Sequence, residues 1–174
     1  MDAQAGRTGC VVGAAPAYAG KQGLNYLPGV SAATVDSQAL WLGSVELPAG
    51  GRTNADIHES HESAFYMVSG DTVEVWTGER LEQREEMAPG DYLYIRPGLA
   101  HVAVNRSETL AFFVGARTDP NEQESVVLRP ELDKLIPFRC RPSPEPAGRR
   151  RCPLRHDRPR PTSRSGVECG AAAS

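Results

Sequence analysis

The sequence predicts an all-β domain, a sandwich or a barrel of short strands, and three observations support this prediction. Apolar runs recur between residues 38 and 128, and turn signals interrupt them about every ten residues. The run at 72–76 alternates apolar and polar residues, as half-buried strands do. No long amphipathic helical pattern occurs between these runs.

The expected strands are short, and most are followed by a turn signal. They span residues 39–47, 64–68, 72–76, 92–95, 102–104, 110–115 and 125–128. Pro48-Ala49-Gly50-Gly51 closes the first strand, and Pro97-Gly98 follows the strand at 92–95. Residues 131–135 fit a short helix. The Gly- and Ala-rich first 30 or so residues either wrap the barrel edge or pair as a strand.

The chain has 174 residues, which is the size of one ordinary domain. We expect an N-terminal arm at 1–37, a barrel at 38–138 and a disordered basic tail at 139–174. Residues 1–138 carry 10 basic and 19 acidic side chains, whereas 139–174 carry 9 basic and 3 acidic ones. The tail is rich in proline and has little apolar surface to bury, so folding would not offset its ordering entropy.

Several classes of protein are disfavoured. No run of about 18 apolar residues occurs, so we expect no membrane partner. No aromatic residues are interleaved with the tail's arginines, so we expect no nucleic-acid partner. The N-terminus does not resemble a signal peptide. The four cysteines, at 10, 140, 152 and 169, lack C-x-x-C spacing and are interpreted as free thiols of a cytoplasmic protein.

Two short patterns contain three of the four histidines. The first is Gly50-x5-Asp56-x-His58-x3-Glu62, and Gly70 follows it. The second is Gly90-x5-Arg96-x-Gly98-x2-His101-x3-Asn105. Asp56 and His58 are two residues apart, so a strand would project both side chains to the same side. Imidazole and carboxylate together suit Zn, Fe, Mn or Ni.

These patterns resemble the two motifs of the cupin superfamily, G-x5-H-x-H-x3,4-E-x6-G and G-x5-P-x-G-x2-H-x3-N. The chain also resembles a group of small, uncharacterised bacterial single-domain cupins. The resemblance implies a double-stranded β-helix, the jelly-roll barrel of two packed antiparallel sheets. It also implies one divalent transition metal per chain, held by His58, His101 and Glu62.

The departures from the motif leave alternatives open. Asp56 stands where the motif has its first histidine, and it is expected either to bind the metal or to orient an imidazole. His61 and Glu62 compete for the third-ligand position. Glu62, if it does not bind the metal, is the candidate general base. Tyr66, Trp76, Tyr94 and Phe112 are expected in the core and not as residues that stack on a ligand.

The expected function is that of a metal-dependent small-molecule enzyme. Oxygenase, isomerase or rearrangement chemistry would occur at an open position on the metal. The alternative is a non-catalytic ligand-binding or accessory cupin. No phosphate-binding loop pattern occurs in the chain. Exposed edge strands pair readily, and cupins commonly form dimers, so we expect a homodimer.

Overall fold

The structure, a computed structural model, describes residues 9–121 and 123–136. The predicted disordered tail lies outside the described residues. The elements are β1 (Tyr18–Ala19), β2 (Asn25–Val30), α1 (Ala32–Val35), β3 (Trp41–Leu47), β4 (Asp56–His58), β5 (Ser63–Ser69), β6 (Val73–Thr77), β7 (Gln83–Met87), β8 (Tyr92–Ile95), β9 (His101–Val104), β10 (Ala111–Arg117), β11 (Val126–Leu128) and the 3-10 helix η1 (Asp133–Leu135).

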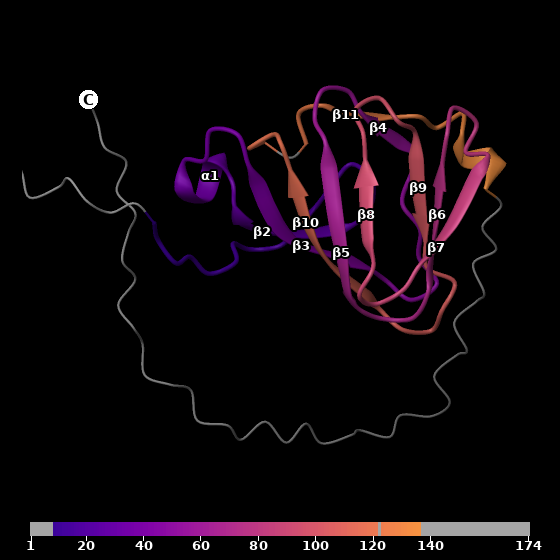
Figure 1. Cartoon of the computed structure of the whole chain (residues 1–174), viewed down its shortest axis with the longest axis horizontal. Helices are drawn as coiled ribbons and strands as arrows, with labels where there is room; N and C mark the ends of the chain where they lie inside the picture. The colour runs from indigo at the N-terminus through magenta and orange to yellow at the C-terminus, as the bar shows by residue number, and fades with distance from the viewer. Residues whose placement is uncertain (1–8, 122, 137–174) are drawn as a thin grey trace, which may run out of the picture. The chain divides into compact units, whose positions relative to one another are not determined.

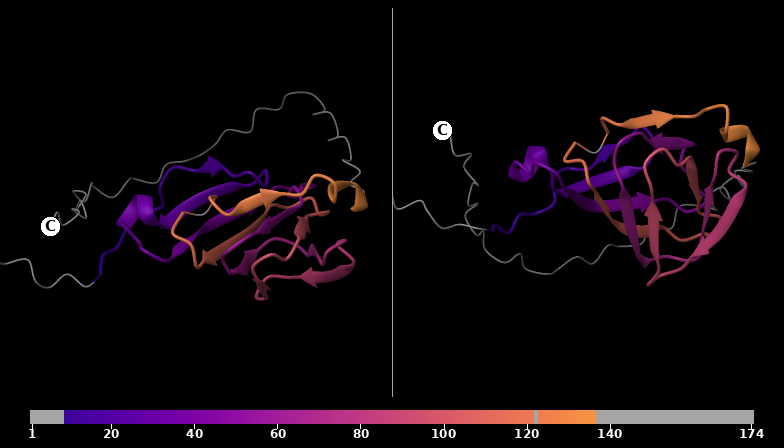
Figure 2. Two further views of the ribbon diagram at one scale, coloured as in Figure 1. Left: turned by 90° about the horizontal axis from the view of Figure 1, so that it is seen from above. Right: turned by 45° about the horizontal axis from the view of Figure 1, so that its top comes forward.

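Two antiparallel sheets face each other and form the barrel (Figures 1 and 2). The first sheet has the strand order β1-β2-β3-β10-β5-β8, and the second has the order β11-β4-β9-β6-β7. The predicted all-β jelly-roll fold is therefore confirmed. Residues 25–30, in the expected N-terminal arm, pair with β3 and widen the first sheet.

The main core lies between the two sheets, because alternate residues of each strand point inward. The first sheet contributes Val45, Leu47, Met67 and Phe113, and the second contributes Val73 and Val75 among others. Each of these side chains is at least nine-tenths buried. Apolar side chains thus fill part of the barrel interior, and the polar residues described below occupy the rest.

The C-terminal described segment covers the outer face of the second sheet. Val102 and Val104 of β9 point outward and pack with Leu132 and Ile136 of this segment. Arg52 holds the segment in place, because it donates hydrogen bonds to the carbonyls of Asp133 and Ile136 and forms an ion pair with the Asp133 carboxylate. The outward-facing residues of β9 are therefore buried.

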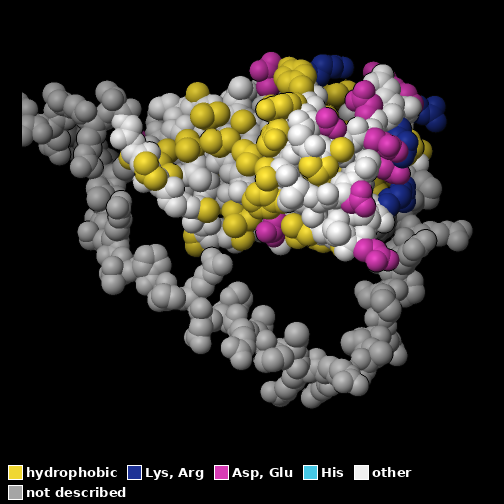
Figure 3. All heavy atoms as spheres, turned by 60° about the horizontal axis from the view of Figure 1, so that its bottom comes forward, with side chains coloured by type: hydrophobic (Ala, Val, Ile, Leu, Met, Phe, Trp, Pro, Cys, Tyr) yellow, Lys and Arg dark blue, Asp and Glu magenta, His cyan; other side chains and the backbone are white. Residues whose placement is uncertain are grey.

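The outer face of the first sheet has exposed apolar side chains instead: Leu42, Tyr66, Val68, Tyr92, Tyr94 and Val114. Tyr94 is 58% exposed and Tyr66 is 37% exposed, so the expectation that both are core residues is wrong. Figure 3 shows one face of the molecule, where hydrophobic side chains spread over much of the surface and charged ones gather on the side of β6 and β7. The homodimer stays a prediction.

No helix among residues 9–121 and 123–136 is long and apolar enough to cross a membrane.

Candidate metal centre

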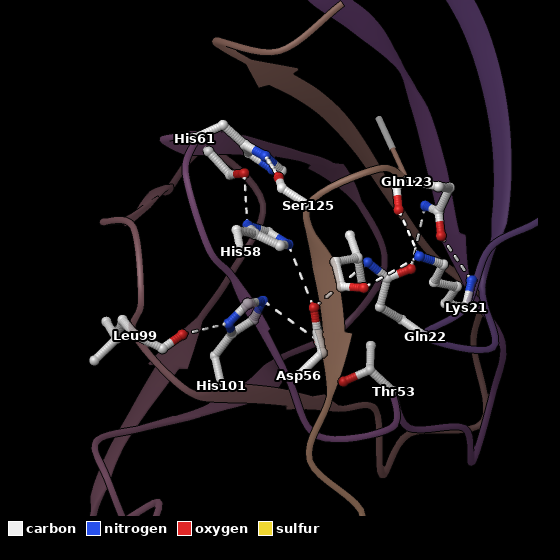
Figure 4. Close-up of polar contacts among 12 residues, drawn as sticks. Lys21, Gln22, Thr53, Asp56, His58, His61, Leu99, His101, Gln123 and Ser125 are labelled. Atoms are coloured by element: carbon white, nitrogen blue, oxygen red, sulfur yellow. Dashed lines mark hydrogen bonds and ion pairs between the residues drawn. The ribbon is translucent and has the colours of Figure 1, made fainter. Parts of the chain in front are cut away.

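Asp56, His58 and His101 meet in the space between the two sheets (Figure 4). Asp56 and His58 are the first and last residues of β4, and strand alternation points both inward. His101 begins β9, where it is the cross-strand neighbour of Asp56. One potential ligand atom from each of the three side chains lies within 4.8 Å of the others. We call these three residues the ligand group.

The carboxylate of Asp56 lies between the two imidazoles. Its Oδ2 atom is 3.4 Å from Nε2 of His58, and its Oδ1 atom is 3.7 Å from Nε2 of His101. The Asp56 and His58 side chains are each 1% exposed, whereas the His101 side chain is 13% exposed. His101 is therefore the member of the ligand group that solvent reaches most easily.

A backbone carbonyl fixes the tautomer of His101. Its Nδ1 atom lies 3.0 Å from the carbonyl oxygen of Leu99, which can only accept a hydrogen bond. Nδ1 therefore carries the proton, and in the neutral ring Nε2 directs a lone pair toward the Asp56 carboxylate. The partner of His58 is the hydroxyl of Ser63, whose Oγ atom is 2.9 Å from Nδ1. Such outer contacts orient metal-binding imidazoles.

The protonation states suit metal binding. Burial lowers the pKa of His58 to about 4, although the adjacent Asp56 opposes this shift. Burial raises the pKa of Asp56, but His101, His58 and Arg117 together outweigh it and hold this pKa below the ordinary value. At neutral pH Asp56 is therefore a carboxylate and His58 a neutral imidazole, which are the forms that bind metals.

The ligand group fits a divalent cation. Oδ1 of Asp56 and Nε2 of His58 are buried and have no hydrogen-bond partner. Each such buried, unsatisfied atom costs about 1–3 kcal/mol. A carboxylate oxygen and two imidazole nitrogens form a donor set suited to Zn, Fe, Mn or Ni. A cation bound among them would satisfy these atoms and would separate the lone pair of His101 from the carboxylate.

His61 lies beside the ligand group without belonging to it. Its ring stacks on that of His58, with the ring centroids 4.5 Å apart. Its Nδ1 atom forms a short hydrogen bond with the hydroxyl of Ser125 and lies 3.6 Å from Oδ2 of Asp119. The Nε2 atom of His61 is buried without a hydrogen-bond partner. His61 thus connects the turn after β4 to the segment before β11.

The structure does not bring Glu62 to the ligand group, in contrast to the expectation from the motif. Glu62 is exposed, and its carboxylate accepts a hydrogen bond of 3.0 Å from the hydroxyl of Tyr94. This hydrogen bond raises the pKa of Tyr94. The cause is the strand alternation, because Ser63 at the start of β5 points inward and its neighbour Glu62 points outward.

The sequence patterns do not identify two further polar residues of the barrel interior. Ser63 is 1% exposed and contacts His58. Gln22 is 2% exposed, and its Nε2 atom lies 3.5 Å from Oδ2 of Asp56. Met67 is a buried residue of β5, and Ser63 lies four residues earlier in the same strand. Strand alternation therefore predicts that the Ser63 side chain also points inward. Gln22 precedes β2 in a Gly-rich segment with no such periodicity.

A separate pocket of about 860 Å³ lies next to this region, between the β6–β7 turn and the segment before β9. Leu99 is part of its wall, and the carbonyl of the same residue accepts the hydrogen bond from His101. The pocket wall has charges of both signs: Arg80, Arg96, Arg129, Glu79 and Glu82. No residue of the ligand group lines this pocket, so we assign the chemistry to the ligand group and not to the pocket.

Acid should destabilise the metal-free protein between pH 6.5 and about 4. The unfolded chain protonates His58 near its ordinary pKa of 6.5, whereas the folded protein does so only near pH 4. The unfolded state therefore binds more protons in this window, and the free energy of unfolding should fall by up to about 3 kcal/mol as the pH falls. Urea unfolding at several pH values, in the presence of a chelator, measures this.

The variant His58→Asn is the control for this prediction, since it removes the titrating ring. It should show a shallower pH dependence, and the remaining slope should include the buried His61, whose pKa burial also lowers. An unchanged slope in His58→Asn would contradict the assignment to His58.

Comparisons with known proteins agree with this architecture. A family profile described as a cupin domain matches residues 43–115, a range that includes the whole ligand group. A protein with a double-stranded β-helix domain from Klebsiella pneumoniae superposes with a TM-score of 0.50 at 16% identity, over 59% of this chain and 81% of that chain. Residues 43–115 are therefore assigned as a cupin domain.

Two further solved structures are similar. Peruvianin-I, a cysteine peptidase from Thevetia peruviana latex, gives a TM-score of 0.52 at 26% identity, over 66% of this chain and 74% of that chain. Oxalate decarboxylase of Bacillus subtilis gives 0.52 at 13% identity, over 60% of this chain and 28% of that chain. A search of curated protein sequences found no match to the chain.

Proposed function

We propose that this protein is a metal-dependent enzyme that acts on a small molecule inside the barrel. One observation carries the proposal: Asp56, His58 and His101 converge within 4.8 Å in a buried space. Two of their polar atoms lack a hydrogen-bond partner there. A set of three protein ligands leaves coordination positions open, and open positions distinguish catalytic metal sites from structural ones.

Each residue of the proposed site has a definite part. Asp56 supplies the negative charge, and His58 and His101 supply nitrogen ligands that Ser63 and the Leu99 carbonyl hold in orientation. A bound metal would supply Lewis-acid or redox chemistry at this place. His101, the most accessible ligand, marks the side from which a small molecule approaches.

The similar proteins support the proposal only in part. The oxalate decarboxylase has Mn(II) centres, so the same fold can hold a metal in another protein. The fold alone does not transfer a substrate or a reaction. Peptidase chemistry of the Peruvianin-I kind is not proposed, because Cys10 is the only cysteine in the described part of the chain and precedes the barrel strands.

Elemental analysis of the full chain, purified without a histidine tag, tests the proposal. We expect about one transition-metal ion per chain, because residues 9–121 and 123–136 contain one such ligand group. Metal-free protein reloaded with Fe²⁺, Mn²⁺, Ni²⁺ or Zn²⁺ should unfold at a higher temperature, since a ligand of the native state stabilises it. No metal after purification and no stabilisation by any of these ions would reject the proposal.

A non-catalytic ligand-binding cupin is the second candidate, and the burial of the ligand group favours it. Two of the three ligands are 1% exposed, which restricts access for a reacting molecule. An experiment that distinguishes the two candidates for oxidative chemistry loads the protein with Fe²⁺ under anaerobic conditions, then adds O₂ and measures its consumption. Consumption of O₂ in excess of the bound iron supports an enzyme.

A further inference from the structure

The turn between β1 and β2 places a polar side chain in the barrel interior. Gln22 lies in this turn, yet it is only 2% exposed, whereas its neighbour Lys21 is exposed. Gly23 follows with a φ of +84°, a backbone conformation that glycine adopts without strain. A glutamine is rarely buried unless its amide has hydrogen-bond partners. The partners of Gln22 therefore indicate what this side chain does.

Four hydrogen bonds hold this turn against the second sheet. The backbone N–H of Asn54 donates to the carbonyl of Gln22 at 2.9 Å, and the Asn54 side-chain amide donates to the carbonyl of Lys21 at 3.2 Å. The ammonium group of Lys21 donates to the carbonyls of Gln123 and Val126, at 2.7 and 3.2 Å. Asn54 lies two residues before β4 and Val126 begins β11, and these strands are neighbours in the second sheet. The turn is therefore fixed relative to β4.

A chain of hydrogen bonds runs from this turn to the ligand group through two glutamine side chains (Figure 4). The backbone N–H of Lys21 donates to Oε1 of Gln123 at 2.8 Å. The Nε2 atom of Gln123 lies 3.3 Å from Oε1 of Gln22. The Nε2 atom of Gln22 in turn lies 3.5 Å from Oδ2 of Asp56, which is a long hydrogen bond. Asp56 is thus connected to the β1–β2 turn by side chains alone.

The first donor of this chain fixes the orientation of both amides. A backbone N–H can only donate, so the atom of Gln123 that faces the N–H of Lys21 is the amide oxygen. The nitrogen of the same amide then faces Gln22, which must present its oxygen. The amide nitrogen of Gln22 is left to donate toward Asp56. Donors and acceptors therefore match along the whole chain, and a flip of either amide would break it.

The two side-chain oxygens of Asp56 differ because of this contact. Oδ2 lies 3.4 Å from Nε2 of His58, and Oδ1 lies 3.7 Å from Nε2 of His101, so either oxygen is near enough to an imidazole to share an ion with it. Oδ2 also faces the amide nitrogen of Gln22, whereas Oδ1 is buried without a hydrogen-bond partner. The contact with Gln22 therefore leaves Oδ1 as the oxygen available to a metal.

We propose that Gln22 is a positioning residue of the metal centre, which holds Asp56 so that only Oδ1 binds the metal, and that Gln123 holds Gln22 in turn. This proposal rests on the proposed metal-dependent function. Neither glutamine binds the metal, so both act through Asp56, as hydrogen-bond partners of metal ligands do. A carboxylate held in this way occupies one coordination position and not two. The metal thereby keeps an additional open position, which a catalytic site needs.

The test measures the affinity and the visible spectrum of Co²⁺ bound to the full chain. Metal-free protein is titrated with Co²⁺, whose absorption depends on the number and arrangement of its ligands. Gln22→Met removes the amide and keeps an unbranched side chain of similar length. It should weaken Co²⁺ binding about ten- to hundredfold. It should also change the spectrum, because Asp56 can then bind through both oxygens, whereas a merely structural role of Gln22 would leave the spectrum of the bound ion unchanged.

Gln123→Met tests the second link of the chain and leaves Gln22 itself unchanged. It should weaken Co²⁺ binding about two- to tenfold, the value of one hydrogen bond. Because Gln123 acts through Gln22, the double variant should bind Co²⁺ within about twofold of Gln22→Met alone. Gln38→Met is the matched control, since Gln38 is exposed and its amide donates to the backbone carbonyl and the carboxylate of Asp36. This control should bind Co²⁺ as the unmodified protein does.

The outcomes separate this proposal from the proposed function. Failure of the unmodified protein to bind Co²⁺ rejects the metal site, and the positioning role with it. Unchanged affinity in Gln22→Met, or weaker binding with an unchanged spectrum, overturns the positioning role and leaves the metal site intact. Additive losses in the double variant overturn the link through Gln123. If Gln22→Met does not fold, Gln123→Met decides: an unchanged affinity overturns the proposal, and a loss of the stated size supports it.

Discussion

His58→Ala and His101→Ala should each reduce the metal content of the purified protein nearly to zero. Either change leaves two ligands, one of them a carboxylate, in a site where three converge within 4.8 Å. Each change removes one of only three protein ligands, so the site no longer has the set that holds a catalytic metal. Elemental analysis measures the result. Circular dichroism should show that the β-barrel persists, because the apolar core lies on other residues.

The neighbouring residues supply the controls for this prediction. Glu62→Ala should retain the metal, because the Glu62 carboxylate is exposed and bound to Tyr94. His61→Ala should retain most of it, since His61 stacks beside the ligand group without joining it. Asp56→Ala should lose it. A protein that keeps its metal as Asp56→Ala and loses it as Glu62→Ala would show that the ligand group is assigned incorrectly.

Asn105→Ala should cost about 3–5 kcal/mol of the free energy of unfolding. Asn105 is completely buried, and its amide nitrogen donates to three carbonyls, those of Leu47, Pro48 and Thr109. Its amide oxygen accepts from the backbone N–H and the hydroxyl of Ser107. Truncation leaves several of these buried groups without partners, and each costs part of its desolvation energy.

Urea unfolding measures this cost, and Asn25→Ala is the matched control. Asn25 is an exposed residue of β2, so its truncation should change stability by no more than about 0.5 kcal/mol. Asn105→Asp should also be destabilising, because a carboxylate cannot donate to the three carbonyls. Equal stabilities of Asn105→Ala and Asn25→Ala would refute this account. The motif asparagine would then have another role.

Strand periodicity predicted most of the barrel, and its failures have physical reasons. The strand expected at 92–95 has the bounds of β8. The strand expected at 102–104 is β9, which begins one residue earlier, at His101. The strand β7, with the sequence Gln-Arg-Glu-Glu-Met, was not predicted, because it is an edge strand whose exposed face carries charges. The strand β2 contains Pro28, which normally argues against a strand.

The candidate site was predictable in part. The spacing of Asp56 and His58 correctly placed both on one side of one strand. The chain bends between His58 and Ser63, so alternation could not be carried across this turn, and the direction of Glu62 did not follow from the motif. Arg117 was missed because the strand was expected to end at Gly115. Two more residues of the same alternation would have placed Arg117 inside.

Gly115 and Phe65 are expected to change together during evolution, because the Phe65 ring occupies the space that a side chain at position 115 would need. A Cβ there would lie 2.9 Å from the Phe65 ring, and no backbone atom is among its close contacts. Alanine at 115 is therefore compatible with the fold only if residue 65 becomes smaller or its ring swings into the barrel interior. Among related sequences, Gly115 and an aromatic residue at 65 should occur together and be lost together. This covariation would preserve the width of the interior without any change in the metal ligands.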